Sequence, residues 1–299
     1  MSVFAKGRGV NIDSPGEKVF GWINIVFLIL LSLVAFIPFL HVLAVSFATH
    51  EEAISTRFLL FPTTFTLENY SIVFGNPQVG RGLMMSVIIT VGGIVTSLFF
   101  TALTAYPLSL KELRGRTLIM FLVIFTLLFR AGIVPNYLLI LNLGLLDSLV
   151  AVILPAAMVP FFLILTINFF RAVPNELRES ARMDGANEAR VLVSVILPLS
   201  KPILATLTLF FAVNYWNEFL RPLLYLSDSS RWPIQVMLRQ IVIMSQGLSL
   251  DQLDPEQIPP PLKSINMTVI VVATIPILLV YPFLQKHFAK GIMLGSIKG

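Results

Sequence analysis

The stretch ESARMDGANEARVLVSVILPLSKP, residues 179–202, decides how the rest of this sequence is interpreted. It concentrates charged residues, one glycine and two prolines, whereas the whole chain is 56% hydrophobic and 12% charged, with a mean hydropathy of +0.86. Soluble domains carry about 25% charged residues. So polar a segment inside so apolar a chain predicts a membrane protein with one specialised polar loop.

The composition excludes several classes of protein. A surface with so few charges would not stay in water, so a soluble domain is not expected. The chain has no cysteine, which excludes disulfides and thiolate metal sites, and we expect no metal. The net charge of +5 does not indicate nucleic-acid binding, because the lysines and arginines are not clustered and are better explained as signals of membrane topology.

Six apolar segments are each long enough to cross about 30 Å of hydrocarbon, which takes a helix of roughly 20 residues. They are Val19–Phe47, Leu83–Leu110, Thr117–Leu138, Leu149–Phe170, Pro202–Leu224 and Ile265–Phe288. The apolar runs are continuous rather than alternating, which favours helices over strands. The first run is too long for the core of a signal peptide. The predicted fold is all-α, a polytopic membrane bundle of six transmembrane helices.

The lysines and arginines predict the orientation of this bundle. With the N-terminus in the cytoplasm, 14 of the 21 lie on the cytoplasmic side, in agreement with the positive-inside rule. Both termini are then cytoplasmic. Residues 1–18 form a cytoplasmic N-terminal segment and residues 19–299 the transmembrane domain. Within that domain, a cytoplasmic loop covers residues 171–201, and outer loops cover residues 48–82 and 227–264.

The cytoplasmic loop has the local chemistry of two short helices joined by a sharp bend. Pro174 and Asn175 suit a helix start, and Gly185 suits a helix end. Asn187 can cap a second helix that runs toward Pro198. The two helices would project a knuckle into the cytoplasm. From physics alone two interpretations stay open, an amphipathic hairpin at the membrane interface and a contact point for a soluble subunit that supplies energy.

The same loop resembles the signature of the permease subunits of ABC importers. That signature places Glu-Ala-Ala, a glycine and an Ile-x-Leu-Pro run at fixed spacing. The matching positions are Glu179, Ser180, Ala181, Gly185 and residues 195–198, with Ser180 and Val195 as mild departures. Residues 132–148, 214–235 and 285–299 resemble the carbohydrate branch, specifically its maltose-permease-G-like subunits. The last two stretches resemble most the subgroup that imports oligosaccharides from complex polysaccharides.

The resemblance implies a type I ABC importer permease of the bacterial inner membrane, with the loop as the coupling helix of a separate ATPase. The coupling residues would be Glu179, Ser180, Ala181, Asp184, Gly185, Leu197 and Pro198. Glu179 would pair with a basic residue of the ATPase, and Gly185 would make the bend. The implied partners are a homologous second permease, two copies of a cytoplasmic ATPase that bind ATP and magnesium, and an extracytoplasmic solute-binding protein. This chain itself would hold no cofactor.

No motif in the sequence indicates an enzyme. Gly75 and Gly80 have P-loop spacing, but Arg81 and Gly82 stand where a P-loop needs lysine and then serine or threonine. The three histidines match no zinc-protease motif, and a G-x-S-x-G nucleophile elbow is absent from the sequence. ATPase activity is therefore expected in a partner subunit.

Polar residues within the predicted spans are the candidates for the substrate pathway, because burying them in lipid is costly unless they pair or line water. They are Arg130, Asn136, Tyr137, Asn214, Trp216, Asn217, Glu218 and Arg221. Aromatic faces and amides suit sugars. Arginines at positions 130 and 221 would favour carboxylated sugars such as alginate or pectin fragments. Alternatively, Glu218 and Arg221 form an i,i+3 pair that only anchors the helix.

The predicted function is therefore the import of oligosaccharides by alternating access. One alternative is a permease of an ABC importer for a solute other than a sugar, which would keep the loop but not the carbohydrate-type stretches. A less favoured alternative is a secondary transporter that works alone. Such a protein would usually show inverted repeats or broken helices, and it would have no use for the knuckle.

Overall fold

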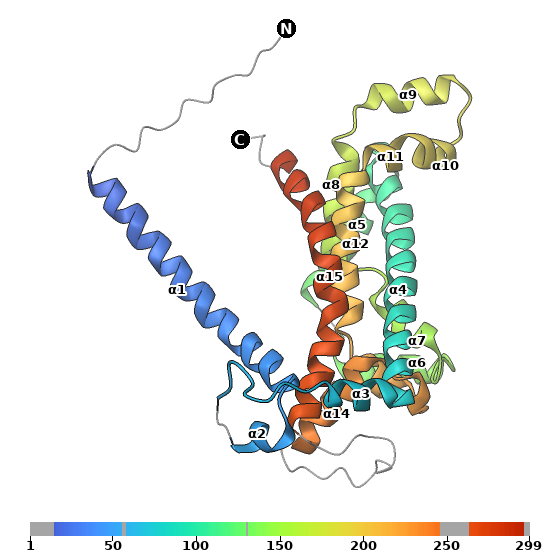
Figure 1. Cartoon of the computed structure of the whole chain (residues 1–299). Coiled ribbons are helices and arrows are strands. Elements are labelled where there is room, and N and C mark those ends of the chain that lie inside the picture. Colours follow the sequence, from blue (N-terminus) through green and yellow to red (C-terminus); the bar gives the residue numbers. More distant parts are fainter. Residues whose placement is uncertain (1–14, 56–57, 130, 246–262, 296–299) are drawn as a thin grey trace.

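Helices form every regular element in the part of the chain that the structure describes (Figure 1). The structure is a computed structural model, and it describes residues 15–55, 58–129, 131–245 and 263–295. Within these ranges there are no strands, which confirms the all-α class.

The first half of the chain contributes α1 (Pro15–Ser46), α2 (His50–Ser55), α3 (Glu68–Gly75), α4 (Pro77–Ser109), α5 (Arg116–Leu128) and α6 (Ile133–Asn142). Next come α7 (Leu149–Ile153), the 3-10 turn η1 (Leu154–Ala156), α8 (Pro160–Arg171), α9 (Asn175–Met183), α10 (Glu188–Val191), the π-helix η2 (Leu192–Ile196) and α11 (Leu197–Leu199). The chain continues through α12 (Lys201–Trp216), α13 (Leu220–Tyr225), the 3-10 turn η3 (Ser229–Arg231), α14 (Ile234–Ser245) and α15 (Lys263–Gly295).

Among the described residues, two helices, α1 and α4, are each long and apolar enough to cross a membrane alone. Three further stretches reach that length only as bent pairs: α5 with α6, α7–η1 with α8 at 54°, and α10–α11 with α12 at 82°. Counting each pair as one span gives up to five spans, and α15 corresponds to the sixth predicted segment. The helical bundle is confirmed, while the count of six spans stays a prediction.

The third, fourth and fifth predicted segments are not the continuous helices that the sequence pattern predicted. The third is interrupted between α5 and α6, where Gly132 has an extended backbone. In the fourth, Pro155 and Pro160 each stand at the start of a new helical element, because proline has no N–H for the turn before it. The fifth ends at Trp216, and Phe219 precedes the separate helix α13.

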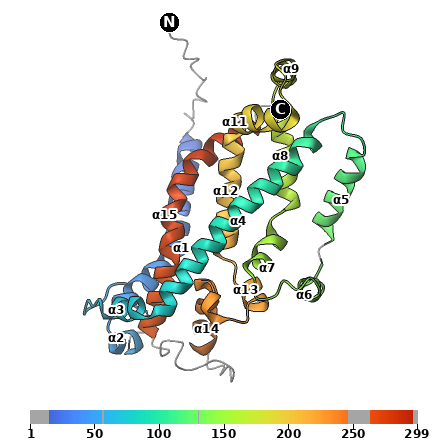
Figure 2. The same cartoon turned by 90° about the vertical axis from the view of Figure 1, so that its right-hand side faces the viewer.

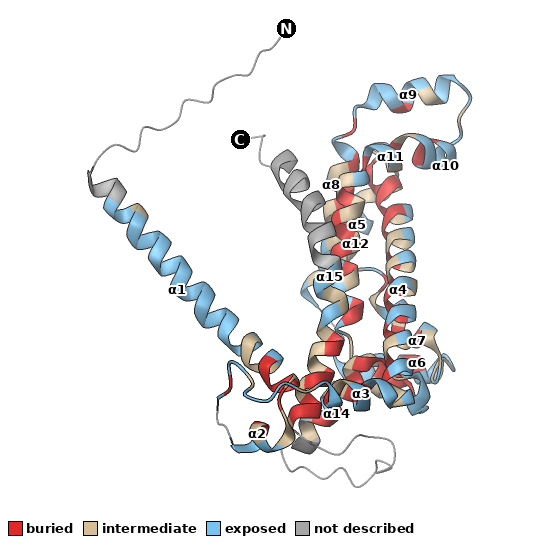
Figure 3. Ribbon diagram, in the orientation of Figure 1, coloured by how far each residue is buried: buried red, intermediate tan, exposed pale blue. Residues whose placement is uncertain are grey.

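Helix α1 leans away from the rest of the bundle (Figures 1 and 3). No residue of its most apolar window is buried, and it meets α15 at its C-terminal end, where Ala44 and Val45 are buried. By contrast, α4 packs against α8 and α12, and α12 packs against α15. An apolar helix this exposed suits lipid or another subunit rather than water.

The polar loop and the outer-loop elements lie at opposite ends of the bundle (Figures 1 and 2). Helices α9, α10 and α11 occupy one end, together with the start of α1. Helices α2, α3 and α14 occupy the other. The structure therefore separates the loop at 171–201 from the described parts of 48–82 and 227–264, as the charge pattern predicted. Which end faces the cytoplasm stays a prediction.

Candidate functional site

The knuckle, defined as residues 175–191, consists of α9 and α10 with a left-handed glycine between them. Gly185 has a φ of 81°, a conformation that side chains disfavour. The Ala186 N–H donates to the Ala181 carbonyl at 2.9 Å, and the Gly185 N–H donates to the Arg182 carbonyl at 3.0 Å. This pair of bonds is a Schellman helix cap. A Cβ at 185 would meet open space, so the bend requires glycine for its backbone conformation and not for room.

Asn187 starts the second helix of the knuckle, as predicted. Its side-chain oxygen accepts a hydrogen bond from the Arg190 N–H at 2.9 Å. The helical run continues to Leu199, past Pro198 as predicted, but it changes from the α-helix α10 to the π-helix η2 after Val191 and then to α11. Pro198 cannot donate to the carbonyl four residues earlier, and the wider π turns precede it. The chain then bends by 82° into α12.

The knuckle has one displayed face and one packed face. Glu179, Ser180 and Asp184 are exposed, and the Met183 side chain is 89% exposed. Ala181 packs against the buried cluster at this end of the bundle, as does Leu197 beyond the knuckle. Pro198 is exposed. Among these residues the sequence pattern missed only Met183; the signal for it is a large apolar residue directly before the Asp184–Gly185 bend.

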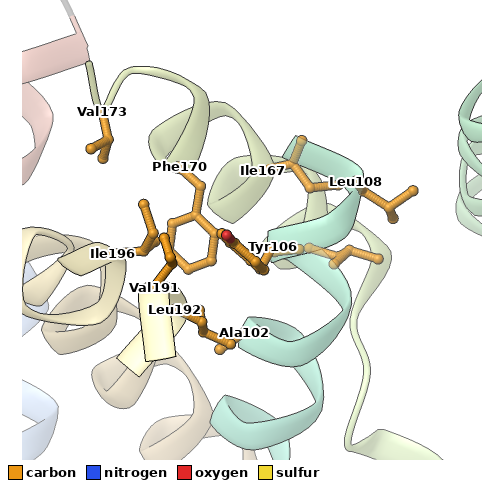
Figure 4. Close-up of a cluster of buried hydrophobic side chains, with 11 residues drawn as sticks. Ala102, Tyr106, Leu108, Ile167, Phe170, Val173, Val191, Leu192 and Ile196 are labelled. Atoms are coloured by element: carbon orange, nitrogen blue, oxygen red, sulfur yellow. The ribbon is translucent and has the colours of Figure 1, made fainter. Parts of the chain in front are cut away.

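Buried apolar side chains from three parts of the chain hold the knuckle to the bundle (Figure 4). Phe170 of α8 is fully buried, and Tyr106 of α4 and Val191 of α10 lie in the same cluster. Ile196 of the π-helix completes this contact. A displacement of the knuckle would therefore be resisted by α4 and α8 together.

Glu188 ties both helices of the knuckle to α4. It accepts a hydrogen bond from the Tyr106 hydroxyl at 2.5 Å through one carboxylate oxygen and from Arg182 Nε at 2.8 Å through the other. The bond from Arg182, followed by that from Tyr106, lowers the pKa of Glu188 below its ordinary value. The sequence pattern missed this network, because it joins residues 82 positions apart.

At the opposite end, the outer mouth is defined as α6 together with residues 214–225. Arg130, which was predicted to line it, lies outside the described residues. The Asn136 side-chain amide donates to the carbonyls of Ala131 and Gly132 at the start of α6. Tyr137 stacks on Tyr225 with a ring-centroid separation of 6.3 Å. Both predicted residues of α6 are thus engaged within the protein, Asn136 by hydrogen bonds and Tyr137 by ring stacking.

The candidates on α12 have different environments. Asn214 is exposed on the last turns of the helix, whereas Trp216 is buried and donates from Nε1 to the Ala273 carbonyl at 3.1 Å. Asn217 is exposed and donates to the Val213 carbonyl at 2.9 Å. The side chains of Asn214 and Asn217 are therefore open to the surroundings, and Trp216 is held in the contact between α12 and α15.

Glu218 and Arg221 form the i,i+3 ion pair that was weighed as an alternative, and the pair is confirmed. Glu218 also accepts hydrogen bonds from the N–H groups of Leu220 and Arg221 at the start of α13. Arg221 donates to the Val152 carbonyl at 3.2 Å. The expectation that these residues lie on the fifth span is wrong, because the glutamate caps a separate helix. The charge of Arg221 is already matched by its neighbour.

Tyr215 is a further residue that the sequence pattern missed. Its hydroxyl contacts the Ser97 hydroxyl at 3.0 Å and donates to the Ile153 carbonyl at 3.0 Å. Its ring covers Gly93, where a Cβ would come within 2.5 Å of ring atoms. Within the outer mouth, this side chain thus joins α12 to α4 and α7. No group of three or more potential metal ligands occurs within the described residues.

Comparison with known proteins identifies relatives over nearly the whole chain. Residues 97–294 match the family described as binding-protein-dependent transport system inner membrane component. The polygalacturonan/rhamnogalacturonan transport system permease protein YtcP of Bacillus subtilis is 50% identical over 95% of this chain and 99% of its own. Protein LplC of the same organism is 48% identical over 96% of this chain and 97% of its own.

A solved structure is similar as well. It is the crystal structure of a bacterial ABC transporter involved in the import of the acidic polysaccharide alginate. One of its chains superposes with a TM-score of 0.84 at 30% identity, covering 92% of this chain and 98% of that one. The likeness of fold therefore covers most of this chain, and the family match over residues 97–294 includes the knuckle.

Proposed function

Because the chain belongs to the family of binding-protein-dependent transport system inner membrane components, we propose that it is a permease subunit that imports acidic oligosaccharides derived from pectin-type polysaccharides. The observation that carries this proposal is the displayed knuckle, which a carrier working alone would not need. Identity of 50% to a polygalacturonan/rhamnogalacturonan permease favours galacturonate-containing substrates, and the alginate importer favours uronates in general.

The knuckle is the proposed contact with a separate ATPase. Glu179 and Asp184 offer carboxylates to basic residues of that subunit, and Met183 offers an apolar contact. Ser180, Ala181, Gly185, Leu197 and Pro198 shape or support this surface. Two copies of the ATPase would bind ATP and magnesium, and this chain would hold no cofactor. A homologous second permease would complete the pathway, and an extracytoplasmic binding protein would deliver substrate.

The proposed mechanism transmits motion from the knuckle to α4. When the ATPases close on ATP, the knuckle moves with them. The bond between Glu188 and Tyr106 and the buried cluster around Phe170 carry that displacement into α4 and α8. Since α4 also packs on α12, the outer mouth follows, and access alternates between the two sides. Both termini are placed in the cytoplasm by the charge pattern.

The complete importer, reconstituted in proteoliposomes with its binding protein, tests this proposal. Uptake of labelled trigalacturonate should depend on internal ATP, and neutral maltotriose should be taken up far more slowly. Equal uptake of both trisaccharides would contradict the acidic substrate. Uptake without an ATPase subunit would contradict the assignment of the knuckle.

A further inference from the structure

A polar cavity of about 170 Å³ lies between α9 and the segment that leaves α4. Four cationic side chains line it against two carboxylates. The cations are Lys111, Arg171, Arg178 and Arg182, and the carboxylates are Glu112 and Glu179. The remaining lining residues, Ser109, Leu110 and Asn175, carry no charge. The proposed transport cycle assigns no role to this surplus of positive charge.

Arg178 is the most unusual member of this lining. Its side chain is only 4% exposed, and it donates one hydrogen bond to the Phe170 carbonyl. Its Nε has no hydrogen-bond partner, and within the described part of the chain Arg178 forms no ion pair. A buried guanidinium is costly unless a hydrogen-bonded anion compensates it, so the charge of Arg178 is incompletely matched by its own chain.

The other charged groups around the cavity offset this imbalance only in part, because Arg178 acts on the Glu188 carboxylate through its charge but forms no ion pair with it. Arg182 is engaged by Glu188, which also receives the Tyr106 hydroxyl. Arg171 contacts only the Leu108 carbonyl, at 3.3 Å, among the described residues. Glu112 and Glu179 line the cavity without forming an ion pair to any described residue.

We propose that this cavity binds a phosphate group, with Arg178 as its principal ligand and Arg171 and Lys111 as its supporting cations. Guanidinium groups match phosphate oxygens in pairs, and a lysine adds a flexible point charge. The phosphate comes from an anionic phospholipid headgroup or from free inorganic phosphate. The bound group would bridge α9 to the end of α4 beside the Tyr106–Glu188 bond.

The position of the cavity suits a lipid source. Ser109 ends α4 and Arg171 ends α8, so the cavity lies where two predicted spans leave the membrane. Basic pockets at the cytoplasmic ends of transmembrane helices lie at the depth of phospholipid headgroups. Free phosphate would reach the same cations from the cytoplasm.

Native mass spectrometry of the complete importer, ATPase included, tests the site. The detergent-purified complex is incubated separately with phosphatidylglycerol, phosphatidylcholine and inorganic phosphate. The wild-type complex should retain one phosphatidylglycerol, or one phosphate, that stays bound when the complex is collisionally activated in the mass spectrometer. It should not retain phosphatidylcholine in the same way. Arg178→Gln should abolish this retention, and Lys111→Gln should weaken it by roughly threefold or more, since it removes one supporting charge.

Two features keep the test decisive. Lys111 is exposed, so Lys111→Gln should fold even if Arg178→Gln disturbs α9. Arg114 is an exposed cation three positions away that does not line the cavity, so Arg114→Gln should bind like wild type. Retention of phosphate without phosphatidylglycerol would support the site with a soluble source. Equal retention by wild type, Arg178→Gln and Lys111→Gln, or none by wild type, would overturn the proposal.

Discussion

The knuckle and the outer mouth each contain one glutamate–arginine pair, and the two pairs differ in what surrounds them. At the knuckle, Arg182 and Glu188 leave 42% and 53% of their side chains exposed. At the outer mouth, Arg221 and Glu218 leave 16% and 15% exposed and also bond to the backbone. The knuckle leaves its polar groups exposed, whereas the outer mouth uses them to hold its own chain together. A polar residue in an apolar segment therefore does not by itself identify a substrate ligand.

The largest expected effect is at the bend of the knuckle. Gly185→Val would place a β-branched residue at a φ of 81°, which costs up to about 3 kcal/mol or forces the knuckle to reshape. Transport should fall roughly tenfold or more while membrane insertion and the ATPase activity of the partner persist. Uptake and ATP hydrolysis measured on the same proteoliposomes would separate these two quantities.

Two matched variants sharpen this prediction. Gly185→Asn should retain more transport than Gly185→Val, because asparagine tolerates the left-handed region. Gly80→Val serves as the control, since Gly80 also has open space for a side chain but does not share the positive φ. Normal transport by Gly185→Val would contradict a coupling role for the knuckle, which would then be an ordinary helical hairpin.

The next effect concerns the pair at the outer mouth. Glu218→Gln leaves the guanidinium of Arg221 partly buried without its carboxylate, which should cost about 2 kcal/mol of stability. The double variant Glu218→Gln with Arg221→Gln should lose less than the sum of the single losses, because neither charge is then stranded. Thermal unfolding of the purified complex measures these differences.

A second i,i+3 pair provides the control. Asp228 and Arg231 lie close to the outer mouth, but about half of each side chain is exposed, at 50% and 48%. Asp228→Asn should leave the unfolding temperature unchanged, because solvent screens exposed pairs. If both glutamate and aspartate variants behaved alike, burial would not distinguish the two pairs, and the structural role of Glu218 would have to be abandoned.

The same comparison explains what could be predicted from the sequence. The bend at Gly185 and the cap at Asn187 depend on hydrogen bonds within a few residues, so local residue chemistry was enough to predict them. The burial of Trp216 against Ala273 and the bond from Tyr106 to Glu188 join distant parts of the chain, and no local pattern reports them. The end of α12 was missed because Glu218 looked like a residue within an apolar span, although its carboxylate caps the next helix.

A smaller effect is expected from the bond between α4 and the knuckle. Tyr106→Phe removes the hydroxyl that donates to Glu188 and keeps the ring in its buried cluster. Because the Glu188 side chain is about half exposed, the hydrogen bond should contribute about 1 kcal/mol to the coupling between the knuckle and α4. Its loss corresponds to about a fivefold decrease in transport per ATP hydrolysed. Uptake and hydrolysis rates, measured together, give that ratio. An unchanged ratio would mean that the buried cluster alone connects the knuckle to α4.

The pH dependence of this bond follows from the lowered pKa of Glu188. Because folding lowers the pKa of the Glu188 carboxyl, its ionised form stabilises the knuckle fully at pH values above the ordinary pKa of 4.5. This stabilisation is lost as the pH falls through the lowered pKa. Coupling that depends on Glu188 should therefore be flat from about pH 5.5 to pH 8. The Tyr106→Phe deficit should be constant across that range. A deficit that grew between these values would mean that another group titrates at the knuckle.

The smallest predicted effect concerns Arg130, in the segment between α5 and α6. Because Glu218 matches the charge of Arg221, Arg130 is the remaining predicted arginine that could attract a carboxylated sugar at the outer mouth. The attraction acts through water and counter-ions, so it should be weak, below about 1 kcal/mol. Arg130→Gln should then slow trigalacturonate uptake by about twofold and leave the slower uptake of maltotriose, an uncharged trisaccharide, unchanged.

Raising the salt concentration should shrink the difference between wild type and variant, because screening weakens the same attraction. Equal slowing of both sugars would show that Arg130, like Arg221, holds the chain rather than the substrate, and the contrast between the two ends of the molecule would then extend to every arginine predicted to line the pathway.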